Sequence, residues 1–135
     1  MAEPIWLDRL LIDAIHLDQL QQHGGRHGVR DEAVIESALA RPRQKWQYES
    51  SCEIPSLAAA YAYGLARNHG FVDGNKRVAF LALYVFLGLN GLSFEASEEE
   101  VVAVIRDVAS GRLGEDEVAA WVRRNVSART EFRDQ

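Results

Sequence analysis

The stretch HGFVDGNKR at residues 69–77 runs directly into VAFLALYVFLGL at residues 78–89. The second stretch is apolar on nearly all faces of a helix, which predicts a buried helix from Asn75 to about Leu89. The first stretch mixes two glycines with polar and charged side chains, which predicts a loop. This junction is either a simple turn before a core helix or an anion-binding loop that carries a base and a metal-binding carboxylate. The rest of the sequence has to decide between these interpretations.

Helical periodicity also dominates the rest of the chain. Asp31 can cap a second helix and Pro42 would stop it, so residues 43–54 are predicted to form a loop. Ser97 and Glu100 have the spacing of a capping box, ahead of a helix that Gly111 closes. Further helices are predicted at residues 6–23, 57–68 and 115–126, and a short extended piece at residues 92–96. We therefore expect an all-α fold, a compact bundle of about six helices around the buried helix at residues 75–89.

The bulk properties of the chain limit its function. Its 135 residues fit one domain, which we expect at residues 1–126, followed by a charged tail at residues 127–135 that frays. The formal net charge of −5 argues against broad nucleic-acid binding, which needs a basic face. No secretory signal is visible, and the longest apolar run, residues 78–87, is shorter than the ~20 residues of a transmembrane helix. We expect a cytoplasmic protein that binds neither membranes nor nucleic acids directly.

The backbone of the junction suits a phosphate group. Gly70 and Gly74 give the loop the freedom to turn its N–H groups toward a ligand. A helix that begins at Asn75 adds unpaired N–H donors and the positive end of the helix dipole. These groups form a phosphate site even before side chains are counted. Gly74 and Asn75 are therefore candidate phosphate-binding residues.

The charges of the junction point the same way. Lys76 and Arg77 would lie in the first turn of the helix, where a cation opposes the helix dipole. A bound polyanion explains them, because the cations and the dipole then act on the same target. Arg67 adds a third cation, so residues 67–77 carry three positive charges against Asp73 alone, within an acidic chain. The local reversal of charge favours an anion site.

Two further side chains suit group transfer. Histidine is the side chain that most often abstracts a proton near neutral pH, which makes His69 a candidate base. Asp73 is an oxygen ligand that could hold Mg²⁺ together with phosphates. A base, a metal ion and cations together describe phosphoryl or nucleotidyl transfer. By contrast, His23 and His27 lack a third metal ligand at a defined spacing, and the lone Cys52 has no neighbour in sequence that would activate it.

The junction resembles a known family. HGFVDGNKR fits the pattern His-x-Phe-x-Asp/Asn-Ala/Gly-Asn-Lys-Arg of the Doc (death-on-curing) toxins, a branch of the Fic superfamily. The segment GGRHGVRDEAVIESALARPRQ at residues 24–44 is similar to the N-terminal part and second helix of that family. The resemblance covers residues 7–122, with the motif as its specific part.

The resemblance implies a role for each residue of the motif. His69 would activate the hydroxyl group of the target, and Asp73 would be the acidic position associated with Mg²⁺. Asn75 and Arg77 would bind phosphates, with help from Arg67. The implied substrate is ATP, and the implied inhibitor is the helix of a Phd-like antitoxin that covers the site.

Lys76 determines which branch of the superfamily the chain resembles. Typical Fic adenylyltransferases have glycine at this position, which makes room for the phosphates when AMP is transferred. A lysine fills that space, and in the Doc branch the nucleotide binds reversed and presents its γ-phosphate. The resemblance therefore implies a kinase that phosphorylates a threonine of elongation factor Tu, with Lys76 as part of the catalytic set.

Two departures keep other functions open. Phe80 and Leu81 stand where Doc-type sequences carry a polar residue, so a phosphate or metal contact from this position would be missing. The chain also lacks the Ser/Thr-x-x-x-Glu-Gly-Asn inhibitory helix of self-inhibited Fic proteins, so inhibition would come from a separate chain. The alternatives are a Fic-type adenylyltransferase and a catalytically degenerate domain that binds a nucleotide or a partner.

Overall fold

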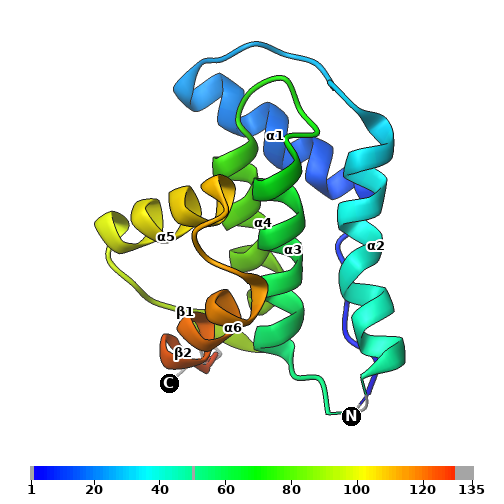
Figure 1. Ribbon diagram of the computed structural model, residues 1–135, viewed down its shortest axis with the longest axis vertical. Helices are drawn as coiled ribbons and strands as arrows, with labels where there is room; N and C mark the ends of the chain where they lie inside the picture. Colours follow the sequence, from blue (N-terminus) through cyan, green and yellow to red (C-terminus); the bar gives the residue numbers. More distant parts are fainter. Residues whose placement is uncertain (1, 50, 130–135) are drawn as a thin grey trace, which may run out of the picture.

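The computed structural model describes residues 2–49 and 51–129 (Figure 1). In this part of the chain there are six helices and two short strands, which confirms the predicted all-α class. The elements are α1 (Arg9–His23), α2 (Glu32–Tyr48), α3 (Ile54–Asn68), α4 (Asn75–Leu89), β1 (Leu92–Phe94), α5 (Glu98–Ser110), α6 (Glu115–Arg124) and β2 (Val126–Ala128). None of the helices in the described residues is long and apolar enough to span a membrane.

Helix α3 lies at the centre of the bundle. It packs against α2, α4, α5 and α6, and it exposes only its last turn, near Arg67. Its small side chains let neighbours approach closely: a Cβ on Gly64 would lie only 3.1 Å from the Cβ of Ala38 on α2. Helix α4 runs beside α3 (Figure 1), but it leaves one apolar face partly uncovered, with Tyr84 49% exposed. The most completely covered helix is therefore α3, and the open face of α4 is available to a ligand or partner.

Helix α2 does not end at Pro42, and the predicted loop at residues 43–54 is wrong for its first half. Pro42 lies inside the helix, where it cannot donate to the carbonyl of Ala38. Two turns continue beyond it because they are anchored to distant elements. Glu115 of α6 accepts from Arg41 Nε at 2.6 Å and pairs with Lys45 Nζ at 3.2 Å. The ring of Trp46 packs edge-on against Trp6 with 6.1 Å between centroids. These tertiary contacts outweigh the local effect of the proline.

Other predicted boundaries also move: α1 begins at Arg9, not at residue 6, and α6 ends at Arg124, not at residue 126. Helix α3 begins at Ile54 with a proline in its first turn, three residues before the predicted start. Ser127 and Ala128, which the sequence assigns to a frayed tail, pair with β1 in a two-stranded antiparallel sheet. The rest of the predicted tail, residues 130–135, lies outside the described residues.

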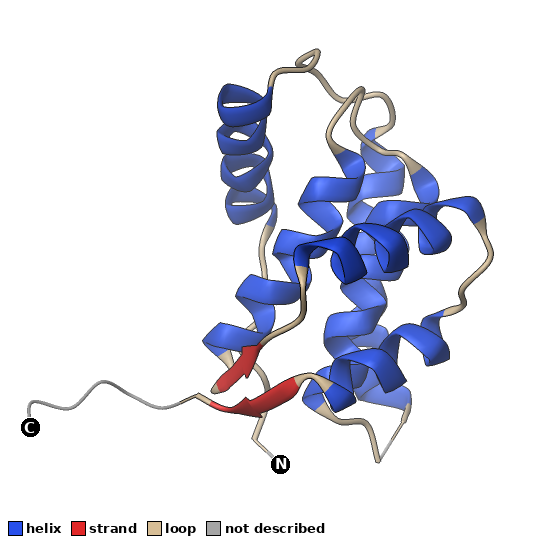
Figure 2. Cartoon of the chain, turned by 90° about the vertical axis from the view of Figure 1, so that its left-hand side faces the viewer, coloured by secondary structure: helices blue, strands red, loops and turns tan. Residues whose placement is uncertain are grey.

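Two connecting segments meet at one end of the bundle. The α1–α2 connection and the α3–α4 loop lie side by side at the top of Figure 1, and Figure 2 shows the same arrangement from the side. Val29 and Phe71 form an isolated antiparallel bridge. Val72 N donates to Gly28 O at 3.0 Å, and Asp31 N donates to Gly70 O at 3.0 Å. The predicted anion-binding loop is therefore fixed by a segment about 40 residues earlier in the chain.

Gly70 is required here by packing, and its substitution is testable. A Cβ on Gly70 would overlap Cγ1 of Ile35, which is fully buried on α2. Gly70→Ala is expected to lower the free energy of unfolding by about 1–3 kcal/mol, measured by urea denaturation. Gly88→Ala is the matched control, because the nearest atom lies at 3.6 Å and an alanine there should be neutral or stabilising.

The overlap with Ile35 also predicts coupling between the two positions. Gly70→Ala should cost less in an Ile35→Ala background, since the smaller side chain makes room for the new methyl group. Purely additive effects would contradict the packing explanation.

Candidate functional site

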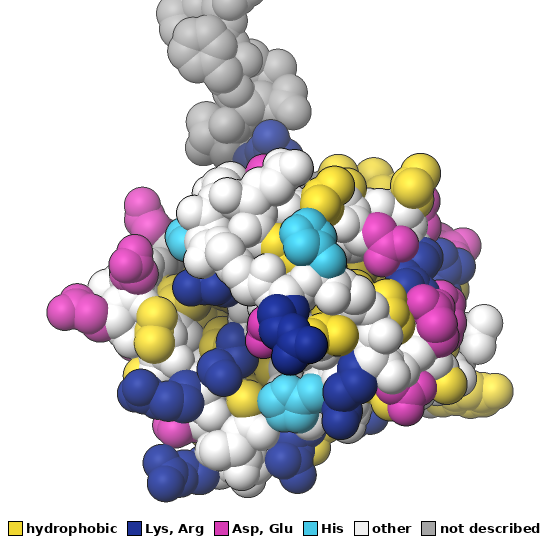
Figure 3. Space-filling view, turned by 90° about the horizontal axis from the view of Figure 1, so that it is seen from above, with side chains coloured by type: hydrophobic (Ala, Val, Ile, Leu, Met, Phe, Trp, Pro, Cys, Tyr) yellow, Lys and Arg dark blue, Asp and Glu magenta, His cyan; other side chains and the backbone are white. Residues whose placement is uncertain are grey.

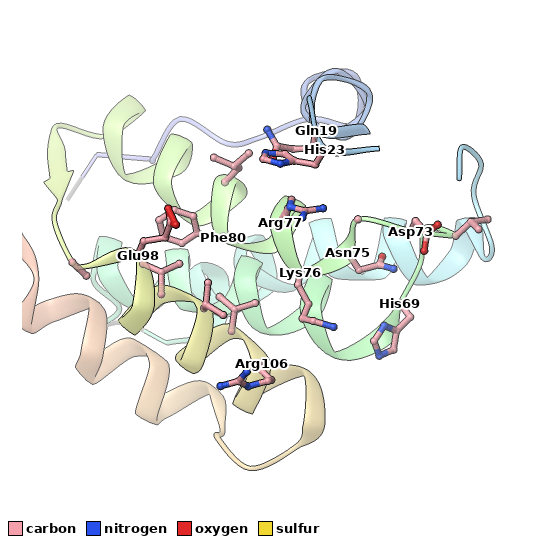
Figure 4. Close-up of a pocket in the computed structure, with 17 residues that line it drawn as sticks. Gln19, His23, His69, Asp73, Asn75, Lys76, Arg77, Phe80, Glu98 and Arg106 are labelled. Atoms are coloured by element: carbon pink, nitrogen blue, oxygen red, sulfur yellow. The ribbon is translucent and has the colours of Figure 1, made fainter. Parts of the chain in front are cut away.

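A cavity of about 980 Å³ opens beside the α3–α4 loop. Helix α4 forms its floor, α1 contributes Gln19 and His23 to one wall, and α5 forms the opposite wall (Figure 4). The cavity brings together His69, Asp73, Gly74, Asn75, Lys76 and Arg77, which are six of the seven predicted site residues. Arg67 is not among the lining residues. Its guanidinium packs instead on the α5–α6 turn, where a Cβ on Gly111 would lie 2.9 Å from Arg67 Nη1.

The first turn of α4 has free hydrogen-bond donors. Gly74 is the N-cap residue and adopts the left-handed conformation with φ 84°. No side chain caps the helix, and its first backbone hydrogen bond runs from Val78 N to Gly74 O at 3.0 Å. Within the described residues, the N–H groups of residues 75–77 therefore have no protein partner. This is the geometry expected of an anion-binding helix N-terminus.

The side chain of Asn75 has a structural role. Its Oδ1 accepts from Phe71 N, and its Nδ2 donates to Phe71 O, both at 2.9 Å. Both halves of the amide are therefore engaged with the backbone of Phe71, and only 9% of the residue is exposed. The predicted phosphate contact of Asn75 is thus limited to its backbone N–H group. The side chain instead closes the loop and fixes the start of α4.

Asp73 is held by the α1–α2 connection. Its Oδ2 accepts from Arg26 N at 2.8 Å, and its backbone carbonyl accepts a 2.8 Å hydrogen bond from His16 Nε2 in the tautomer that donates there. His16 is buried on α1 and stacks on Phe71 with 3.8 Å between ring centroids. No sequence signal singled out His16, because its partner lies 57 residues away.

Asp73 retains one carboxylate oxygen with no protein partner in the described part of the chain. The same part of the chain has no cluster of three or more residues able to bind a metal ion. Asp73 alone therefore fits Mg²⁺ only if phosphates and waters supply the remaining ligands, which is a common arrangement for this ion.

His69 is the C-cap of α3 and lies at the mouth of the cavity (Figure 4). Its backbone is left-handed, with φ 50° and ψ 56°. The imidazole is exposed, and within residues 2–49 and 51–129 it makes no hydrogen bond. Both ring nitrogens are therefore open to a substrate, as a general base requires.

Cations gather at the site although the chain is acidic overall. Lys76 and Arg77 line the cavity, and both are exposed without an ion pair among the described residues. Arg106 of α5 reaches the cavity from the opposite wall (Figure 4). Figure 3, which views this end of the molecule, shows lysine, arginine and histidine side chains gathered on the face, with acidic side chains mainly toward its margins. Sequence reasoning missed Arg106, because it stands in an ordinary amphipathic helix with no motif around it.

The other half of the cavity is apolar. Phe80, Leu81, Val101, Val102 and Ile105 line it, and Val102 is 53% exposed. Phe80 and Leu81 supply no polar group here, as the sequence indicates. The cavity therefore joins the free donors and cations at the start of α4 to a mainly hydrophobic groove between α4 and α5, which also carries Glu98 beside Phe80 (Figure 4).

Two ionisable groups outside the cavity, Cys52 and Tyr61, have pKa values that are shifted by burial. Burial raises the pKa of the Cys52 thiol, which disfavours the reactive thiolate. Burial also raises the pKa of Tyr61, whose hydroxyl accepts a hydrogen bond from Leu7 N at 3.0 Å. Tyr61 is therefore a core residue that anchors the N-terminal segment.

Fold and site define an all-α domain in which a loop with free N–H donors and nearby cations connects two adjacent core helices. The model of the Fic/DOC family matches residues 6–87, which is more than half of the chain. The protein named Toxin Doc from Mycolicibacterium smegmatis (strain ATCC 700084 / mc(2)155) is 35% identical over 100 residues, covering 72% of this chain and 77% of that protein. The chain belongs to the Fic/Doc family, which confirms the resemblance seen in the motif. Helices α5 and α6, which include Arg106, lie outside the residues matched by the family model.

The structural role of Asn75 predicts an effect in the absence of any ligand. Asn75→Ala would leave the buried N–H and carbonyl groups of Phe71 without partners, so the free energy of unfolding should fall by about 2–4 kcal/mol. Lys76→Ala is the control, because its exposed side chain makes no described contact and its loss should change stability by less than about 0.5 kcal/mol. Urea denaturation of the ligand-free proteins measures both. Equal stability of Asn75→Ala and the wild type would show that the amide serves a ligand and not the loop.

Proposed function

We propose that this chain is the toxin of a toxin–antitoxin system and that it phosphorylates a threonine of elongation factor Tu, which blocks translation. The observation that carries the proposal is Lys76 in the cavity, next to the free N–H groups of α4 and within the segment matched by the family. The similarity to a protein named Toxin Doc supports the toxin function. The substrate is ATP, with Mg²⁺ as its cofactor.

The cavity has the parts that phosphate binding requires. The N–H groups of residues 75–77 point out of the start of α4, and Lys76 and Arg77 add charge beside them. These donors would hold the phosphates of ATP and stabilise charge that develops on the transferred group. The free oxygen of Asp73 and the phosphates would hold Mg²⁺, which supplies charge neutralisation between the phosphates.

His69 would act as the general base. A ring nitrogen accepts the proton of the threonine hydroxyl as the hydroxyl oxygen attacks the γ-phosphorus. The bond between the γ-phosphorus and the bridging oxygen of ADP breaks, and ADP leaves with the electron pair. The products are a phosphothreonine, ADP and a proton on His69, which the solvent removes because the imidazole is exposed.

Lys76 distinguishes this reaction from AMP transfer. In an adenylyltransferase of the same family, glycine at this position leaves room for the phosphates beyond the α-phosphate. The Lys76 side chain lines the cavity and would occupy that room. A nucleotide that presents its γ-phosphate to His69 fits this arrangement better than one that presents its α-phosphate.

A binding-only function is the second candidate, and two observations favour it. Leu81 places an apolar side chain in the cavity, and the Asn75 amide is turned away from a ligand. At each of these two positions, a polar contact that a phosphotransferase could make with its substrate is missing. A protein of this kind would bind ATP and transfer nothing.

The first experiment is a label-transfer assay with purified protein, Mg²⁺ and elongation factor Tu. Label from γ-labelled ATP and none from α-labelled ATP is expected, and His69→Ala should abolish transfer because no base remains. His27→Ala is the matched control, since this exposed histidine lies outside the cavity lining and should leave transfer unchanged. Label from the α position alone would mean AMP transfer and a different role for Lys76. ATP binding without transfer would favour the binding-only function.

We further propose that a Phd-like antitoxin helix occupies the apolar groove and covers the site. The groove is continuous with the anion-binding end, and its side chains Phe80, Val101 and Val102 suit the apolar face of an amphipathic helix. A helix seated there would close the path of ATP to Lys76 and His69.

Calorimetry of ATP binding with and without the antitoxin tests this arrangement. The antitoxin should weaken ATP binding, and Val102→Asp should weaken antitoxin binding about tenfold or more, because a carboxylate would be buried in the groove. Unchanged ATP affinity in the saturated complex would place the antitoxin elsewhere on the surface.

A further inference from the structure

The backbone of His69 needs support. His69 is the one non-glycine residue with positive φ in the described part of the chain. The left-handed conformation is uncommon for residues with a Cβ, and it persists where the surroundings impose it. The His69 side chain makes no hydrogen bond among the described residues that could hold it in place. The backbone conformation therefore sets the direction of the Cα–Cβ bond of His69, from which the imidazole extends.

Arg30 contacts the backbone on both sides of this position. Its Nε donates to His69 O at 2.9 Å, and its Nη2 is 3.4 Å from Asn68 O. Its own backbone N–H donates to Gly70 O at 2.8 Å. One residue of the α1–α2 connection thus binds three consecutive carbonyl groups, those of residues 68, 69 and 70. Two of them are oriented by the guanidinium, which also complements the negative end of the α3 dipole.

The rest of the loop does not depend on this side chain. Val72 is held through its N–H group by Gly28 O, and Asp73 is held through its carboxylate by Arg26 N. Phe71 is held by Asn75. These bonds involve only the backbone of the α1–α2 connection or residues of the loop itself. Loss of the guanidinium would therefore free residues 68–69 while the phosphate-binding turn at residues 74–77 keeps its supports.

We propose that Arg30 is a positioning residue for His69: its guanidinium holds the backbone of His69 in the left-handed conformation and so aims the imidazole at the phosphate-binding turn. The proposal rests on the proposed function, in which His69 is the base. Without the guanidinium, His69 can relax to negative φ and its imidazole moves relative to Lys76. A displacement of about 1 Å in a reacting group can reduce the rate about 100-fold.

A purely structural role for Arg30 makes a different prediction. If the guanidinium only stabilised the C-terminal end of α3, its loss would lower the free energy of unfolding. It would not lower kcat separately from the ATP affinity. A positioning role predicts that kcat falls while ATP still binds, because the phosphate-binding groups are not supported by Arg30.

The test uses Arg30→Met, which keeps the aliphatic stem and removes the donors, and Arg30→Lys, which keeps one charged donor. Arg26→Met is the matched control, because this exposed arginine lies in the same connection and its side chain makes no described hydrogen bond or ion pair. Three quantities are measured for each protein. They are the three-bond coupling between the amide proton and Cβ of His69 by NMR, which distinguishes positive from negative φ, the ATP affinity by calorimetry, and kcat for phosphate transfer.

For Arg30→Met we expect a changed coupling at His69, ATP affinity within about twofold of the wild type, and kcat lower by about 10- to 100-fold. Arg30→Lys should recover part of kcat, and Arg26→Met should match the wild type in all three quantities. An unchanged coupling would overturn the proposal, whatever happens to kcat. Equal losses of ATP affinity and kcat would also overturn it, since the whole loop would then depend on Arg30. If the wild type binds ATP but transfers no phosphate, the proposed function fails, and the coupling in Arg30→Met decides the positioning role by itself.

Discussion

The pair of hydrogen bonds between the Asn75 amide and the backbone of Phe71 is the constraint on which the site depends. It closes the loop from Phe71 to Asn75 and sets the first residue of α4. It also holds the Phe71 ring in the core, where only 2% of the residue is exposed. That ring then stacks on His16, and His16 Nε2 lies 2.8 Å from the carbonyl of Asp73. The start of α4, where we propose that phosphate binds, is therefore fixed in place, because its first residue is a core residue. A ligand would meet donors that are already in place, which lowers the entropic cost of binding.

The fold could be predicted wherever local patterns agree with tertiary packing. Helix α4 begins and ends where its apolar pattern indicates, and Ser97 caps α5 by accepting from Glu100 N as its spacing predicts. The prediction that α2 ends at Pro42 was wrong, because Lys45 and Trp46 beyond the proline are held by Glu115 and Trp6, which are distant in sequence. The sequence also did not reveal that α3, and not α4, is the most completely buried helix. The apolar pattern of α4 is the more continuous of the two, but part of it lines a groove.

The same distinction applies to the site. The motif identified six residues that share one cavity, since residues 69–77 are adjacent in sequence and span one helix start. It could not show that the Asn75 side chain turns inward or that Arg67 packs on Gly111, because each depends on a partner in three dimensions. Arg30, His16 and Arg106 come from three other elements, and their relation to the loop is set by the packing of the whole bundle. Sequence therefore specifies which groups can react, and the fold specifies which of them are free to do so.

The ligand-free site carries unfavourable interactions that an anion would remove. Three N–H groups at the start of α4 have no protein partner in the described residues, and Lys76 and Arg77 lie where a cation opposes the helix dipole. Each such cation costs about 0.3–1 kcal/mol at an exposed position. A bound polyanion would accept hydrogen bonds from these N–H groups. It would also attract Lys76 and Arg77, so the groups that are unfavourable in the free protein would favour the complex. A ligand present at 100 times its Kd would stabilise the fold by about 2.7 kcal/mol, as for any ligand that binds the native state alone. The interactions that weaken the free protein are thus those that would favour a phosphate group at the first turn of α4.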